Sequence, residues 1–204
     1  QAHRNPGRWD LGYAASKSFE ISGPGADTAI RWSTIAIIIM LVFAVGWALY
    51  RLCAGGWTTR TTMAFFSVMV LLLIATNKVF SPQYIVWLGP LLAVVIRQRL
   101  PQGFTTLRVV QRLLAVCAII AAALGTLVYP FNYDYIWHYV GENMFPVYLL
   151  VARNILIVVM AIIGLIWFAL EVALAGKLER AGIHQPHAPS ALAQPVLRRR
   201  GGPV

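Results

Sequence analysis

The sequence predicts an all-α transmembrane fold with five membrane helices that form part of a larger bundle. Of its 204 residues, 59% are hydrophobic and only 12% are charged. The apolar residues also stand in long blocks rather than in the alternation of an amphipathic surface element. Long apolar blocks separated by short polar segments are typical of a polytopic membrane protein.

The five expected helices correspond to apolar windows, because about 20 residues of helix cross a bilayer. The windows are 34–53, 61–77, 82–97, 109–129 and 146–172. The third is short unless Arg97 extends to the head groups. The transmembrane region is therefore 34–172, preceded by an extracytoplasmic segment, 1–33. It is followed by a basic cytoplasmic tail, 173–204, that we expect to be disordered.

Positive charge sets the expected orientation. If the five windows alternate in direction, most of the 17 Lys and Arg residues fall on one side. The positive-inside rule places that side in the cytoplasm. We expect the protein to cross the plasma membrane. The basic residues of this side are Arg51, Arg60, Arg97, Arg99, Arg108, Arg112, Lys177, Arg180, Arg198, Arg199 and Arg200. The N-terminal segment, the turn 77–84 and the loop 130–145 would then share the outer surface.

The net charge of +10 suits contact with anionic membrane lipid. We expect no nucleic-acid partner, because no basic helix or RNA-binding motif accompanies the charge. Cys53 and Cys117 fall near or within apolar blocks and give no support to a disulfide framework. His184 and His187 lack further ligands at metal spacing, so no metal or other cofactor is expected. The chain opens on Gln1 without a signal sequence, and we expect it to be the C-terminal part of a longer protein.

The turn 77–84 carries the clearest chemical signal. Ser81 followed by Pro82 is a helix-start pattern, since serine is a favoured N-cap and proline at the first position loses no hydrogen bond. Free N–H groups and the positive end of the helix dipole would then lie near Lys78, which suits a phosphate. In the alternative interpretation, Lys78 reaches the head groups and Asn77 ends the second helix.

The third helix is expected to present a polar and aromatic face. Gln83 and Trp87 are four residues apart and Pro90 lies three further on, so α-helical spacing places them together. Pro90 should also kink the helix by removing a backbone hydrogen bond. An amide, an indole and a kink on one face predict a cavity.

Arg153 is the second candidate for anion binding. It follows a plausible helix start at Pro146 by about two turns, which is roughly 10 Å into the membrane. A charge at that depth is costly unless it pairs or faces a polar cavity. It could bind an anion together with Lys78, or it could reach outward or pair with Glu142.

The loop 130–145 is rich in aromatic residues with polar neighbours. Such rings could receive a sugar or a polyprenyl chain, although an interfacial aromatic belt has the same composition and is the interpretation we favour. The residues are Tyr129, Phe131, Asn132, Tyr133, Asp134, Tyr135, Trp137, His138 and Tyr139.

The run Asn77-Lys78-Val79-Phe80-Ser81-Pro82-Gln83-Tyr84, followed by Trp87 and Pro90, resembles the NK-x-x-SPQY-type signature of glycosyltransferase family 87. This family comprises GT-C membrane enzymes, including actinobacterial mannosyltransferases that use polyprenyl-phosphate mannose. Ala152-Arg153-Asn154 on a later helix also resembles the C-terminal region of the family. The resemblance covers mainly residues 61–172.

The resemblance implies a GT-C-like bundle and a hexosyltransferase. Such an enzyme moves a sugar, with mannose the first expectation, from a polyprenyl-phosphate donor to a lipid or glycan acceptor on the extracytoplasmic face. The anomeric carbon would be inverted. Lys78, Ser81 and Arg153 would bind the donor phosphate; Asn77, Pro82, Gln83, Tyr84 and Trp87 would shape the site. The family's general-base aspartate belongs to an early loop, which we expect upstream of Gln1.

Two alternatives from other classes use the same residues. A transporter or flippase-like protein would move a lipid-linked anion with the same basic groups and without bond chemistry. A structural subunit would use Lys78 and Arg153 to contact a partner.

Overall fold

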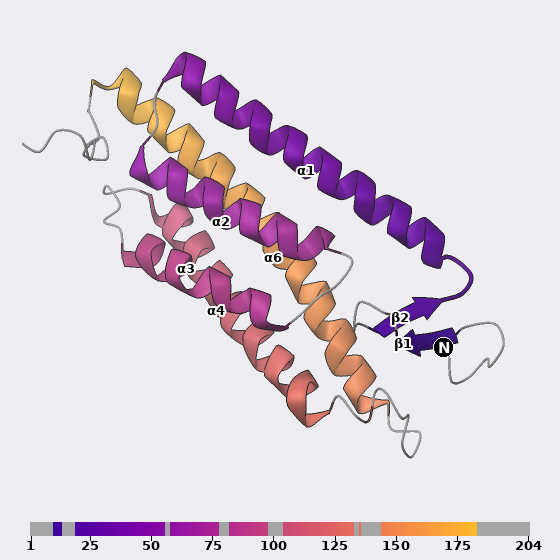
Figure 1. Ribbon diagram of the computed structural model, residues 1–204. Coiled ribbons are helices and arrows are strands. Elements are labelled where there is room, and N and C mark those ends of the chain that lie inside the picture. The colour runs from indigo at the N-terminus through magenta and orange to yellow at the C-terminus, as the bar shows by residue number, and fades with distance from the viewer. Residues whose placement is uncertain are drawn as a thin grey trace, which may run out of the picture.

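The computed structural model describes residues 10–13, 19–55, 58–77, 82–97, 104–132, 135 and 144–182. Long helices lie side by side in this part of the chain, with a small strand pair next to the start of the first helix (Figure 1). The elements are β1 (Asp10–Tyr13), β2 (Phe19–Ser22), α1 (Ala26–Ala54), α2 (Thr59–Thr76), the 3₁₀ helix η1 (Pro82–Trp87), α3 (Leu88–Arg97), α4 (Thr105–Thr126), the π-helical turn η2 (Leu127–Phe131) and α6 (Phe145–Arg180).

Four helices of the described chain are long and apolar enough to cross a membrane. They are Ala26–Ala54, Thr59–Thr76, Thr105–Phe131 and Phe145–Arg180. The helical class expected from the sequence is therefore confirmed, but the five expected crossings are not. The window 82–97 is divided into a six-residue 3₁₀ helix and the ten-residue α3. Ten residues of α-helix extend about 15 Å, half of a hydrocarbon core about 30 Å thick.

The described residues before the first crossing include a strand pair. β1 and β2 pair antiparallel, with Asp10 opposite Ser22 and Tyr13 opposite Phe19. α1 then begins at Ala26, so the expected boundary between residues 33 and 34 lies within a helix. Asp27 lies in the first turn of this helix, where an acidic residue is favourable to the helix dipole.

Three helices share a buried interior. α2 and α4 each pack against α6, and the side chains that face one another at these contacts are almost completely buried. The most buried apolar members are Ala64, Val68, Leu71, Leu114, Ala121, Met160 and Trp167, each at most 1% exposed. α6 approaches α2 at Gly164, where a Cβ atom would lie 2.7 Å from Cδ1 of Leu71.

The directions of these helices follow from one set of contacts. Arg60 near the start of α2 and Gln111 near the start of α4 both donate hydrogen bonds to Glu171 near the end of α6. We call this end of the bundle the basic end. The basic residues close to it on α1, α2, α4 and α6 are Arg51, Arg60, Arg108, Arg112, Lys177 and Arg180.

α2 runs away from the basic end, and the chain must return before α4 begins at Thr105. η1 and α3 provide that return, packed against α2 and α4 (Figure 1). The expected grouping of basic helix ends at one end of the bundle is therefore present although the return segment is not a full-length helix.

α1 lies on the outside of this bundle. Met40 is its one buried residue, and its contact surface is aromatic: Phe43 and Trp47 pack on the ring of Phe168 at centroid distances of 6.1 and 4.9 Å. Near its start, the Ser33 hydroxyl donates to the carbonyl oxygen of Thr76 at 2.6 Å. The outward side of α1 is apolar, which suits contact with lipid.

Candidate functional site

The turn 77–84 begins where α2 ends. Asn77 is the C-terminal cap of α2, with an extended backbone and its N–H donating to the carbonyl oxygen of Leu73 at 3.1 Å. This agrees with the alternative interpretation of the sequence, in which Asn77 ends the second helix and Lys78 reaches the head groups. Lys78 and Ser81, the two residues expected to bind phosphate with Arg153, lie outside the described residues.

A helix begins at Pro82, as Ser81-Pro82 predicts, but it is not an α-helix. η1 is 3₁₀ from Pro82 to Trp87, and α3 begins only at Leu88. The helix that begins at Pro82 is therefore not the α-helix that the sequence predicts, and its position relative to Lys78 lies outside the described residues. A six-residue 3₁₀ helix does not supply the aligned peptide dipoles of several α-helical turns.

The aromatic face of this segment differs from the expected one for the same reason. A 3₁₀ helix has three residues per turn, so residues i and i+3 eclipse one another. Trp87 accordingly packs on Tyr84, with ring centroids 4.9 Å apart and planes inclined by 42°. The α-helical spacing that placed Gln83 beside Trp87 does not apply. Tyr84 is half-buried, and Trp87 remains 52% exposed.

Pro90, at which the sequence predicts a kink, lies near the start of α3. Pro90 is the third residue of α3. N–H groups in the first turn of an α-helix have no intrahelical acceptor, so proline there removes no hydrogen bond. The break in this segment is instead the change from 3₁₀ to α-helix between Trp87 and Leu88.

Arg153 lies inside the bundle. α6 begins at Phe145 with Pro146 in its first turn, which confirms the expected helix start within one residue. Arg153 is two turns further on and only 3% exposed. Its guanidinium donates to Oδ1 of Asn154 from Nη2 at 3.0 Å and from Nε at 3.3 Å. This burial argues against a side chain that reaches outward; Glu142, the suggested partner, lies outside the described residues.

The antiparallel pairing of α2 and α6 relates Arg153 to the turn. Arg60 meets Glu171, and Leu71 faces Gly164 further along both helices. Continuing in these directions, α2 reaches Asn77 at the half of α6 that carries Arg153. The described parts of the predicted site therefore lie in the half of the bundle opposite the basic end.

Exposed aromatic side chains surround the end of α4. Tyr129, Phe131 and Tyr135 are 55%, 67% and 47% exposed, and η2 also packs against α6. Exposed rings at a helix end fit the interfacial belt that we favoured. The other aromatic residues of the loop, and His138, lie outside the described residues.

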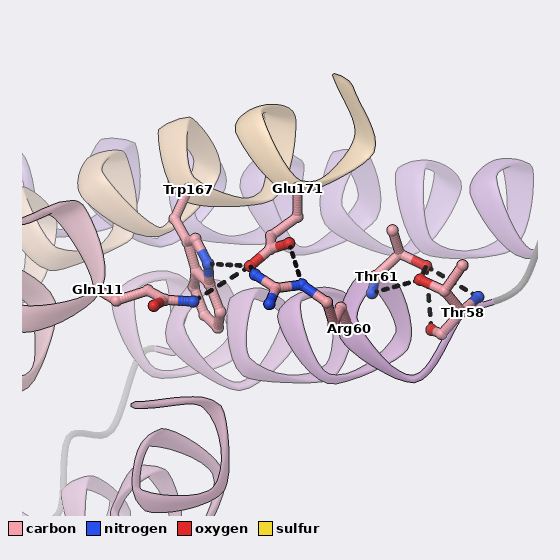
Figure 2. A network of polar contacts seen from close by, with 6 residues as sticks. All are labelled: Thr58, Arg60, Thr61, Gln111, Trp167 and Glu171. Atoms are coloured by element: carbon pink, nitrogen blue, oxygen red, sulfur yellow. Dashed lines mark hydrogen bonds and ion pairs between the residues drawn. The ribbon is translucent and has the colours of Figure 1, made fainter. Parts of the chain in front are cut away.

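The structure adds a buried polar cluster that the sequence interpretation missed. The Glu171 cluster consists of Arg60, Gln111, Trp167 and Glu171 (Figure 2). Arg60 donates from Nη2 to Oε1 at 2.7 Å and from Nε to Oε2 at 3.0 Å. Gln111 Nε2 and Trp167 Nε1 donate to the same Oε1 at 3.1 and 3.2 Å. Glu171 is only 1% exposed, and each of its carboxylate oxygens accepts at least one hydrogen bond.

The sequence already indicates that Glu171 is unusual. An acidic residue near the end of a long apolar helix is costly in a membrane and indicates a partner. Trp167 is four residues before it, on the same helical face. The sequence offers many basic residues as partners, however, and only the packing of α2 against α6 selects Arg60.

The remaining predictions concern the C-terminal tail, the two cysteines and metal binding. α6 continues to Arg180, past the expected boundary at 172, and residues 183–204, including His184 and His187, lie outside the described residues. Cys53 and Cys117 are free thiols. Over the described ranges, no three His, Cys, Asp or Glu residues gather where they could hold a metal ion.

Comparisons of the chain with models of known protein families, with curated proteins and with solved structures give no match. The resemblance of the turn 77–84 to glycosyltransferase family 87 remains a prediction.

Proposed function

We propose that the protein is a membrane glycosyltransferase that moves a sugar from a polyprenyl-phosphate donor to a lipid or glycan acceptor on the extracytoplasmic face of the plasma membrane. Mannose is the sugar that the family resemblance suggests. The observation that supports the proposal most is the burial of Arg153, at 3% exposure, in the half of the bundle where α2 leads into the turn 77–84.

The depth of Arg153 suits a lipid-linked donor. The polyprenyl chain of the donor stays in the hydrocarbon, so its phosphate is presented near the membrane surface. Arg153 is about two turns inside α6, and a guanidinium can donate two hydrogen bonds to one phosphate. The apolar surroundings strengthen this charged contact, because the local dielectric constant is low. Lys78 and Ser81 are proposed to supply a second cation and a hydroxyl donor.

The neighbouring residues suit recognition of the rest of the donor. The Tyr84–Trp87 pair presents half-exposed aromatic rings, against which a sugar ring or a prenyl unit can pack. The amides of Asn77 and Gln83 are proposed to bind sugar hydroxyl groups. Asn77 caps the end of α2, and Pro82 begins the helix that carries Gln83.

The proposed reaction is a displacement at the anomeric carbon. The acceptor oxygen forms the new bond on the face opposite the leaving group, so the configuration is inverted. The bond from carbon to phosphate oxygen breaks, and polyprenyl phosphate leaves with the electron pair. Arg153 and Lys78 stabilise the charge that develops on this leaving group. A carboxylate base receives the acceptor proton. We do not assign this base among the described residues.

The test uses the intact protein in proteoliposomes with radiolabelled polyprenyl-phosphate mannose and a mixed lipid acceptor extract. We compare the wild type with Lys78→Ala and, as a matched control, with Arg112→Ala, which removes an exposed charge on α4. The proposal predicts transfer of label to acceptor that Lys78→Ala abolishes and Arg112→Ala retains. Movement of intact donor across the bilayer without transfer would instead establish the transporter.

A further inference from the structure

The Glu171 cluster joins three helices at the basic end. Arg60 belongs to α2, Gln111 to α4, and Trp167 and Glu171 to α6 (Figure 2). The capping box of Thr58 and Thr61 fixes the start of α2, with each backbone N–H donating to the other side chain at 3.2 Å. Arg60 lies between these two residues, in the turn that the capping box holds.

The cluster is closed to water. Glu171, Gln111 and Trp167 are 1%, 3% and 0% exposed, and the Arg60 side chain is 11% exposed. An apolar layer continues inward from it, with Leu114 of α4 wholly buried one turn beyond Gln111. On α6, Leu174 is 2% exposed on the side nearer the basic end. Polar contacts therefore lie between two apolar layers.

Separation of these helices would be costly. Moving α2 or α4 away from α6 would leave the Glu171 carboxylate in an apolar interior without donors, and an unpaired buried charge is strongly unfavourable. The same movement would leave the Arg60 guanidinium without its carboxylate. The contacts thus favour one closed arrangement over any opened one.

We propose that Arg60, Gln111, Trp167 and Glu171 form a clasp that keeps the α2–α4–α6 bundle closed at the basic end, so that a substrate reaches the interior only from the opposite end. The clasp does not depend on the proposed reaction. It does bear on the alternative, because a transporter that works by alternating access would have to open this end as well.

The test measures access to the interior from the basic end. In a background with Cys53→Ser and Cys117→Ala, a single cysteine is introduced by Leu114→Cys, and the protein in membrane vesicles is treated with a water-soluble maleimide. Glu179→Cys, at an exposed position on α6, is the matched control for reagent access. Ala64→Cys, at a wholly buried position one turn inward of Arg60 on α2, is a second reporter in case Leu114→Cys lowers the yield of folded protein.

We expect rapid labelling at position 179 and labelling at 114 that is at least about 10-fold slower, as for a position protected by closed structure. Adding Glu171→Gln should raise the rate at 114 by about 10-fold, while the rate at 179 stays unchanged. Labelling at 114 as fast as at 179 with the clasp intact would overturn the proposal. An unchanged slow rate after Glu171→Gln would overturn the role of the clasp.

Discussion

Arg60 and Glu171 are 111 positions apart in the chain, yet their side chains meet in two parallel contacts of 2.7 and 3.0 Å. This paired geometry fixes the direction of α2 against α6 and brings the beginnings of α2 and α4 to the end of α6. It therefore defines the basic end, and with it the opposite half of the bundle, where Arg153 and Asn77 at the end of α2 lie.

Replacing only one partner of the Arg60–Glu171 pair should destabilise the protein more, for each residue replaced, than replacing both partners. Glu171→Leu leaves the Arg60 guanidinium buried without its carboxylate, so we expect a loss of about 3 kcal/mol in the free energy of unfolding. Arg60→Met should have a similar effect. In the double variant the two losses should be less than additive, because neither buried charge remains. Unfolding of the purified proteins by detergent titration measures the free energy of unfolding of the two single variants and of the double variant.

Glu179→Leu provides the control for this cycle, since Glu179 is an exposed acid on the same helix. Its effect should be within about 0.5 kcal/mol of zero. Strictly additive losses for Arg60→Met and Glu171→Leu would contradict an interaction between the two side chains.

A methyl group at Gly164 should force the buried Leu71 side chain to shift. The Cβ of alanine would lie 2.7 Å from Cδ1 of Leu71, which is itself buried. We expect Gly164→Ala to destabilise the protein by about 1–3 kcal/mol, the range for overpacking in a filled core. Gly176→Ala, on the same helix with nothing within 4 Å of its Cβ position, should be neutral or stabilising. Thermal unfolding in detergent compares the two; equal midpoints would refute this close approach of α2 and α6.

The hydrogen bond that joins α1 to α2 should contribute less to stability than the Arg60–Glu171 pair. Ser33→Ala removes a hydrogen bond of 2.6 Å to the carbonyl oxygen of Thr76 and should cost about 1 kcal/mol. Thr34→Ala is the matched control, because the Thr34 hydroxyl donates only within α1, to Ile30. Hydrogen exchange at the end of α2 should increase in Ser33→Ala and not in Thr34→Ala. The same protection in both variants would exclude a role for this contact.

The class of fold could be predicted from the sequence because apolar length alone determines which segments can cross a bilayer. Four of the five predicted windows correspond to helices of sufficient length. The window 82–97 is not confirmed as a membrane-spanning helix, because hydropathy does not distinguish α-helix from 3₁₀ helix and the change at Trp87 shortens the α-helical part. The strand pair before α1 depends on pairing between short segments, which apolar windows do not report.

The sequence could single out a residue of the candidate site only where that residue is anomalous by itself. Arg153 is a charge in an apolar window, and its burial confirms that it is not a surface residue. The partner of Glu171 was not predictable, since it follows from helix packing and not from spacing along the chain. The face shared by Gln83 and Trp87 was wrong because it assumed 3.6 residues per turn.

The most direct test of the central claim, that Lys78 and Arg153 bind one donor phosphate, is a double-mutant cycle on donor use. Initial rates of mannose transfer are measured in proteoliposomes over a range of polyprenyl-phosphate mannose concentrations for Lys78→Ala, Arg153→Ala and the double variant. Loss of a charged hydrogen bond predicts a decrease of about 10-fold or more in kcat/KM for each single variant, at equal amounts of folded protein. If both groups bind the same phosphate, the double variant should lose less than the product of the two decreases. Unchanged donor kinetics in Arg153→Ala at normal protein levels would contradict the account.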